Sequence, residues 1–196
     1  MSYYPDTLSL LEARTLFFRR ANLGHDGGYT DRWVRVESKP IPFYFPNTPA
    51  RVAAARLHDL HHIAAEYQTD WPGEAQIAAW EIASGCAHHY WAWVPNLGAF
   101  TIGMALCPKR LFRAFVRGRH ATNLYKDGFA ESCLGNVTVG ELRHRLGLAG
   151  ACRAACPADV AWFAIWCIVG FLWHGMLAVL GVVALWVVWR LWLLVR

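Results

Sequence analysis

The chain has 196 residues, enough for one folded domain and an additional segment. Its apolar share of 56% exceeds the roughly 45–50% of soluble domains, and its formal net charge is +5. We expect anionic lipid rather than nucleic acid as the partner of this charge, because the basic residues form no stripe interleaved with exposed aromatics. The six cysteines include no C-x-x-C pair, so we expect reduced packing residues rather than a disulfide framework.

Residues 1–49 are predicted to form an N-terminal helix followed by extended chain and loop. The helix is expected over 7–24, with Thr7 or Ser9 as its N-cap. Residues 32–44 carry Pro40 and Pro42 and predict an extended edge segment or a short hairpin. The start lacks the apolar stretch and cleavage site of a signal peptide, so we expect the domain to stay in the compartment of synthesis.

Residues 50–150 are predicted to form a compact helical domain, which makes the fold class all-α. Thr48 and Pro49 are a typical cap and first helical residue. Thr138 and Glu141 have the spacing of a capping box for a short closing helix. Pro95-Asn96 predicts a break. The expected helices are 50–67, 74–91, an apolar stretch at 98–107, a basic helix at 109–119 and a last helix ending near Gly147.

Residues 158–196 are predicted to be a transmembrane anchor. Ala161 to Trp189 is a run of 29 residues without a charged side chain, longer than the ~20 that cross a bilayer. A domain of this size cannot bury such a helix on all sides. We expect one long tilted helix, with a tight hairpin around Gly175 or Gly181 as the alternative. Arginines before the anchor predict a cytoplasmic domain on a bacterial inner membrane.

Four residues form a candidate site for one divalent metal. His58 and His62 are four apart on a predicted helix, so their imidazoles share a face, and Asp59 is adjacent. Glu74 follows a Pro-Gly break that can fold the next helix back. Zinc accepts such imidazole and carboxylate ligands, as do iron and manganese. The competing interpretation is a histidine pair with no metal, and the spacing by itself does not separate the two.

Glu81 is the candidate catalytic residue. Glu74, Glu81 and His88 are spaced by seven and form a stripe along one helix. A carboxylate on the metal-bearing face could orient a histidine ligand or act as a general acid or base. The alternative is a solvated polar stripe. Three further histidines are predicted not to be ligands: His61, His89 and His120.

The pattern H-D-x-x-H, eleven residues and then E resembles the signature of the coenzyme Q (ubiquinone) biosynthesis protein 4 family. It is present here as His58-Asp59-Leu60-His61-His62 and Glu74, and Thr69-Asp70 with Gly73-Glu74 is similar to that family's T-D-x-x-G-E. The segments 115–121 and 141–148 also resemble its basic segment and its closing helix. The resemblance covers roughly residues 50–148. The N-terminal 45 residues and the anchor depart from it.

The resemblance implies a helical domain that binds one divalent ion, usually zinc, and a prenylated quinone precursor. Its ligands would be His58, Asp59, His62 and Glu74. The implied activity is decarboxylation at ring carbon 1, possibly oxidative, which would make the protein a metal-dependent lyase, and no organic cofactor is implied. The competing function is a non-catalytic metal-containing lipid-binding scaffold. With either function, the expected partners are the bilayer and other biosynthetic proteins or a second copy of the chain. A metal-free structural protein would leave the spacing unexplained.

Overall fold

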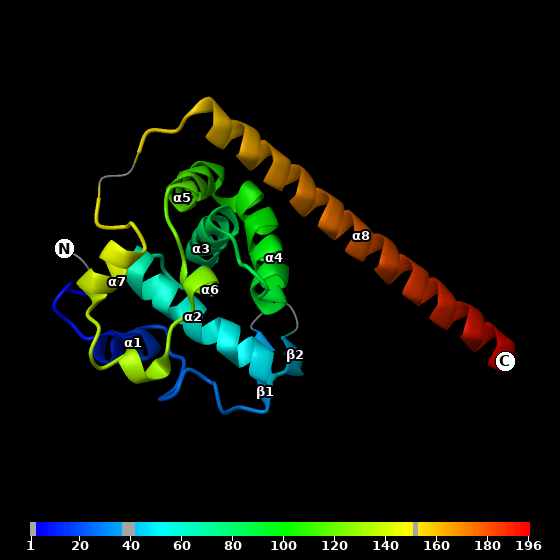
Figure 1. Ribbon diagram of the computed structural model, residues 1–196. Helices are drawn as coiled ribbons and strands as arrows, with labels where there is room; N and C mark the ends of the chain where they lie inside the picture. The colour runs from blue at the N-terminus through cyan, green and yellow to red at the C-terminus, as the bar shows by residue number, and fades with distance from the viewer. Residues whose placement is uncertain (1–2, 37–41, 151–152) are drawn as a thin grey trace.

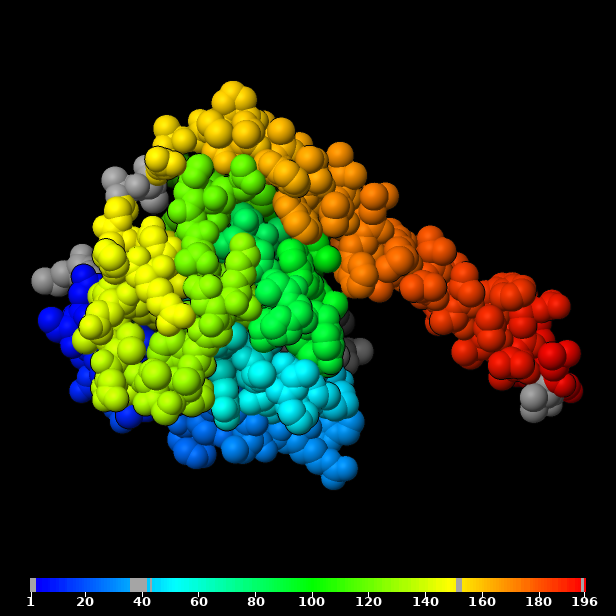
Figure 2. Space-filling model, in the orientation of Figure 1, coloured from blue at the N-terminus to red at the C-terminus, as the bar shows by residue number. Residues whose placement is uncertain are grey.

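The computed structural model describes residues 3–36, 42–150 and 153–196, so Pro40 and Cys152 lie outside the described residues. The chain is mostly helical, which confirms the predicted helical class, and a two-stranded sheet adds to it. The helices α1 to α7 pack into a compact body, and the long helix α8 leaves this body at one edge (Figure 1). The space-filling view shows the same body with α8 projecting from it (Figure 2).

The N-terminal segment supplies one helix and the sheet. Helix α1 (Leu10–Arg20) is capped by Ser9, one of the two predicted caps, whose side chain pairs with Glu12 in a capping box. Strands β1 (Trp33–Val36) and β2 (Phe43–Pro46) form an antiparallel hairpin in which Val34 is opposite Phe45. The hairpin confirms the extended chain predicted there. Helix α1 packs on α2 and shares its hydrophobic core.

Helices α2 and α3 carry the candidate site. Helix α2 (Pro49–Ala65) is capped by Thr48, as predicted. Helix α3 (Trp71–Ser84) begins three residues before the predicted start at 74, because the Asp70 side chain caps it. It ends at Ser84 rather than near 91, since Gly85 leaves the helical conformation.

Helix α4 (Tyr90–Leu106) corrects the prediction of a break at Pro95, which lies inside the helix. Pro95 is the sixth residue of the helix and lacks the N–H that would bond to the Trp91 carbonyl, so the packing of α4 against α3 holds the helix through this position. Helices α5 (Pro108–Arg119), α6 (Leu124–Asp127) and α7 (Val139–Arg145) follow, with a 3-10 turn at Glu131–Cys133. The predicted capping box of Thr138 and Glu141 is present at α7.

Two hydrophobic clusters hold the body together. The larger one joins α1, α2, α6 and α7, and includes Trp80 of α3 and Tyr125 of α6. The smaller one joins α3, α4 and α5 around Phe100 and Phe115. Helix α3 contributes to both clusters and has its closest packing with α5 and α4. The site on α2 and α3 is therefore built on the most enclosed helix of the body.

Helix α8 (Pro157–Val195) is one continuous helix of 39 residues, as we expected for the anchor, and it does not form the alternative hairpin. Its first part packs against α4 and α5 through side chains such as Phe163. Over 175–194 every residue is exposed. The helix is long and apolar enough to cross a membrane. The predicted cytoplasmic side and bacterial inner membrane stay predictions.

Candidate metal centre

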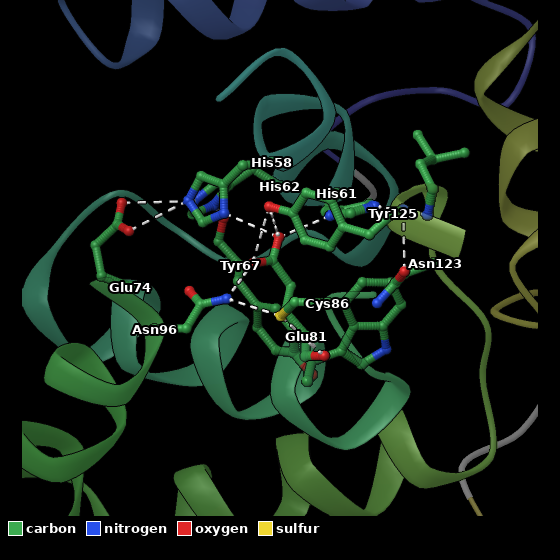
Figure 3. A network of polar contacts seen from close by, with 12 residues as sticks. His58, His61, His62, Tyr67, Glu74, Glu81, Cys86, Asn96, Asn123 and Tyr125 are labelled. Carbon is green, nitrogen blue, oxygen red and sulfur yellow. Dashed lines mark hydrogen bonds and ion pairs between the residues drawn. The ribbon is translucent and has the colours of Figure 1, made fainter. Parts of the chain in front are cut away.

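Three of the four predicted ligands meet at one point (Figure 3). The Nε2 atoms of His58 and His62, one turn apart on α2, are 3.1 Å from each other. From α3, Glu74 places one carboxylate oxygen 3.5 Å from His58 Nε2 and the other 3.4 Å from His62 Nε2. One donor atom from each of the three residues lies within 4.8 Å of the others. This arrangement could hold a metal ion, whose identity it leaves open.

The turn between α2 and α3 brings Glu74 back to the histidines. Glu66 ends α2 in a left-handed conformation, and the Asp70 carboxylate accepts a hydrogen bond of 2.8 Å from the backbone N–H of Gly73. A Cβ atom at Gly73 would lie 2.1 Å from the carbonyl oxygen of Gln68. Only glycine permits this contact without movement of the backbone, so the residue before Glu74 helps to set the position of its carboxylate.

The outer hydrogen bonds of the two imidazoles leave both Nε2 atoms facing the centre, where a bound ion would replace the proton between them. His58 donates from Nδ1 to the Glu81 carboxylate at 2.9 Å, and His62 donates from Nδ1 to the Tyr67 carbonyl at 2.9 Å. In a neutral imidazole the other nitrogen is then an acceptor. Metal-ligating histidines are held in this way by a carboxylate or carbonyl on the outer nitrogen. The donor set therefore fits a divalent ion.

Glu81 is the hub of a buried polar network behind this centre (Figure 3). Its side chain is fully buried and accepts hydrogen bonds from His58 and from His61 Nδ1 at 2.7 Å. It also accepts from the Asn96 amide at 2.6 Å and from the Tyr125 hydroxyl at 3.2 Å. Both carboxylate oxygens are used in these bonds, which favours the predicted role of orienting a ligand over that of a general acid or base.

The fourth predicted ligand, Asp59, is engaged elsewhere. It is 8% exposed and accepts a short hydrogen bond from the Tyr29 hydroxyl. Burial raises the pKa of Asp59, and Tyr29, the two site histidines and Arg51 oppose the rise. Asp59 is not among the described residues whose donor atoms meet at the centre. Its ligand role stays a prediction.

The carboxylates of Glu74 and Glu81 give the centre negative charge, which favours the binding of a cation. Burial opposes the charged forms of Glu74 and Glu81, yet the histidines outweigh it and hold the pKa of both carboxyls well below the usual range. Burial would likewise lower the pKa of His58, but Glu81 and Glu74 raise it well above its ordinary value. In the absence of a metal, a proton on His58 neutralises part of this charge. A divalent ion would replace that proton.

One side of the centre is open. The side chain of His62 is 1% exposed, whereas those of His58 and Glu74 are 24% and 35% exposed. Three protein ligands with an accessible side are typical of catalytic metal sites, which keep a coordination position for water or substrate. Structural zinc sites are instead closed by four protein ligands.

Several residues of the network carry no signal in the sequence. Tyr29, Asn96 and Tyr125 come from distant segments, and only the tertiary packing brings them to Asp59 and Glu81. His61, predicted not to be a ligand, donates from Nδ1 to Glu81 and accepts the backbone N–H of Leu124 at Nε2, so both nitrogens are occupied.

Three tryptophans of α3 and α4 make ring contacts with other parts of the chain. Trp80 is fully buried against His61, with ring centroids 5.2 Å apart. Trp91 stacks on Phe45, and Trp93 stacks on Trp166 of α8.

Comparisons with protein-family models, with curated proteins and with solved structures find nothing that matches this chain.

Proposed function

We propose that this chain is a membrane-anchored, metal-dependent protein that acts on a prenylated aromatic acid. The observation that carries the proposal is the pair of imidazoles whose Nε2 atoms converge with the Glu74 carboxylate. The choice of substrate comes from the resemblance to the coenzyme Q biosynthesis protein 4 family. The apolar α8 supports it, because a prenylated substrate resides in a membrane.

The reaction we propose is loss of the ring carboxyl group. The bond between ring carbon 1 and the carboxyl carbon breaks, carbon dioxide leaves, and the electron pair stays on the ring, which takes up a proton. A bound divalent ion would act as a Lewis acid that stabilises this developing charge. An oxidative version, in which water supplies a hydroxyl group to the same carbon, removes two electrons and would require dioxygen as their acceptor, reduced to hydrogen peroxide, with iron or manganese in place of redox-inactive zinc.

The residues of the centre have separate roles in the proposed reaction. His58, His62 and Glu74 would hold the ion. Glu81 and the Tyr67 carbonyl keep the imidazoles in the tautomer that presents Nε2. The exposed side of the centre, between His58 and Glu74, is where the substrate carboxylate or phenolate would approach. Enclosure on the His62 side excludes water there.

The alternative is a scaffold in which the metal only grips a lipid head group. The open, three-ligand geometry favours the enzyme, because a purely structural ion is usually enclosed. The two functions differ in turnover. The metal-loaded full chain, in detergent with a prenylated hydroxybenzoate, should release carbon dioxide. The non-oxidative reaction should proceed without dioxygen, and the oxidative version should need it. Stoichiometric binding of this compound without any release of carbon dioxide would establish the scaffold.

The metal itself is tested by elemental analysis of the purified full chain. We expect one divalent ion per chain, and loss of that ion in His62→Ala. The matched control is His88→Ala, because His88 is exposed and is not in the candidate group. Equal metal content in His62→Ala and the parent would exclude this site. Lipid extraction and mass spectrometry of the same sample would show whether a quinone precursor co-purifies.

A further inference from the structure

The first part of α8 is packed firmly on the body, so the direction of the helix is set by the domain. Phe163 inserts between aromatic rings of α4 and α5, with its centroid 5.6 Å from that of Phe100. Trp166 stacks on Trp93 of α4 at 5.4 Å. At Gly170 a Cβ atom would lie 2.6 Å from the Thr101 hydroxyl, so the two helices approach closely there.

A second anchor fixes the beginning of α8. The buried carboxylate of Asp159, in its first turn, accepts hydrogen bonds from the backbone N–H of Cys156 at 3.0 Å and from Arg119 of α5 at 3.2 Å. Arg119 also lies over the ring of Trp162. Polar and aromatic contacts thus hold the helix at both ends of its packed part, and a hinge between body and helix is not expected.

The rest of α8 has the length of a bilayer core. Residues 175–194 are exposed throughout. At ~1.5 Å per residue these 20 positions span about 30 Å, the thickness of the hydrocarbon region. Arg190 lies near the far end, where a long side chain can reach the head groups. If α8 crosses a bilayer, the surface nearer the body would therefore lie close to His174, where the packed part of the helix ends.

The body meets this surface with one particular side. In Figure 1, the β-hairpin and the beginning of α4 lie on the side of the body toward which α8 runs, whereas α1 and α7 lie on the opposite side. Ring contacts connect these parts in space: Phe45 of β2 stacks on Trp91 of α4 at 5.9 Å, and Trp93 stacks on Trp166.

This side exposes large amphipathic side chains. Trp33, Tyr44 and Tyr90 are 52%, 57% and 60% exposed, and Val94 is 44% exposed. The register pairs Trp33 with Pro46 and Arg35 with Tyr44, which puts Trp33 and Tyr44 on the same face of the hairpin, away from Phe45. We call the three exposed aromatic residues the aromatic face: Trp33, Tyr44 and Tyr90.

We propose that the aromatic face is a second membrane contact, which rests among the head groups of the bilayer that α8 crosses. Tryptophan and tyrosine concentrate at this depth of a membrane, because their rings are apolar and their N–H and O–H groups need polar partners. The proposal commits to lipid because α8 brings this side to the bilayer at a fixed angle. It rests on the proposed membrane anchoring by α8 and is independent of the metal centre and of the proposed substrate.

The test is lipid crosslinking of the full chain. The protein is reconstituted in phosphatidylcholine and phosphatidylglycerol vesicles that contain a phospholipid with a photoactivatable diazirine in its upper acyl chain. After illumination, modified peptides are identified by mass spectrometry. We expect crosslinks on α8, on the hairpin and on the beginning of α4, and none on α1, although Leu11 of α1 is 49% exposed. Crosslinks confined to α8 would overturn the proposal.

A variant provides a second readout. Replacement of both Trp33 and Tyr44 by serine should abolish the hairpin crosslinks while those of α8 persist. The matched control is Leu11→Ser, an equally exposed apolar residue on the other side, which should leave the crosslinks unchanged. The hairpin of the vesicle-bound protein could instead lack lipid crosslinks and become protected from modification only when a second protein is added. That result would assign the aromatic face to a protein partner and would also overturn the proposal.

Discussion

Replacement of Glu81 by glutamine separates the buried network from the metal ligands that it supports. Glutamine has nearly the same shape, but it carries no charge and presents an NH₂ group in place of one oxygen. Glu81 accepts from four donors on His58, His61, Asn96 and Tyr125. An amide cannot satisfy them all, because its NH₂ group must face at least one N–H or O–H.

The size of the expected destabilisation follows from the complete burial of the Glu81 side chain. Removal of one partner from a buried charged network costs about 3–5 kcal/mol. For a chain of this size, about 2–4 °C of thermal midpoint corresponds to 1 kcal/mol, so the low end of that range predicts a fall of roughly 6–12 °C. His58 would also lose the acceptor that fixes its tautomer. Loss of such an outer partner weakens metal binding by about 10- to 100-fold.

The assay combines thermal unfolding of the full chain with a chelator competition for zinc. The control is Glu131→Gln, the same substitution at a side chain that is 45% exposed and paired with Arg14. A surface ion pair contributes about 0–1 kcal/mol, so this control should change little. If Glu81→Gln kept the parental unfolding midpoint and zinc affinity, the network would not support the site and the reasoning would be refuted.

Three further predictions concern the same centre. Gly73→Ala should displace Glu74 and weaken zinc binding in the chelator competition, because the added Cβ would overlap the Gln68 carbonyl; unchanged affinity would contradict this. Tyr29→Phe should remove the hydroxyl donor of buried Asp59 and destabilise the domain by about 1–3 kcal/mol, as measured by thermal unfolding, and an unshifted midpoint would show that the bond is dispensable. Because the pKa of His58 is raised, zinc binding near neutral pH should release about one proton, and the affinity for zinc should fall as the pH falls below that pKa. Titration in weak buffer measures the proton release. A zinc affinity that is constant with pH would count against this prediction.

The sequence by itself determined the features that depend on neighbouring residues. The caps at Thr48 and Thr138, the shared face of His58 and His62, and the uncharged length of α8 follow from spacing along one helix, and the structure confirms them. Local hydrogen bonds and helical periodicity need no tertiary contact, so a single sequence suffices to predict them.

Only the tertiary structure decided which groups surround the site and how α8 meets the body. Pro95 lies inside α4, whose apolar side chains pack against α3, although its local preference predicts a break. The pairing of Asp59 with Tyr29, and of Glu81 with Asn96 and Tyr125, joins residues 15 to 44 positions apart. Such contacts arise because buried polar groups must find partners wherever the packed core brings them, and no periodicity along the chain encodes that choice.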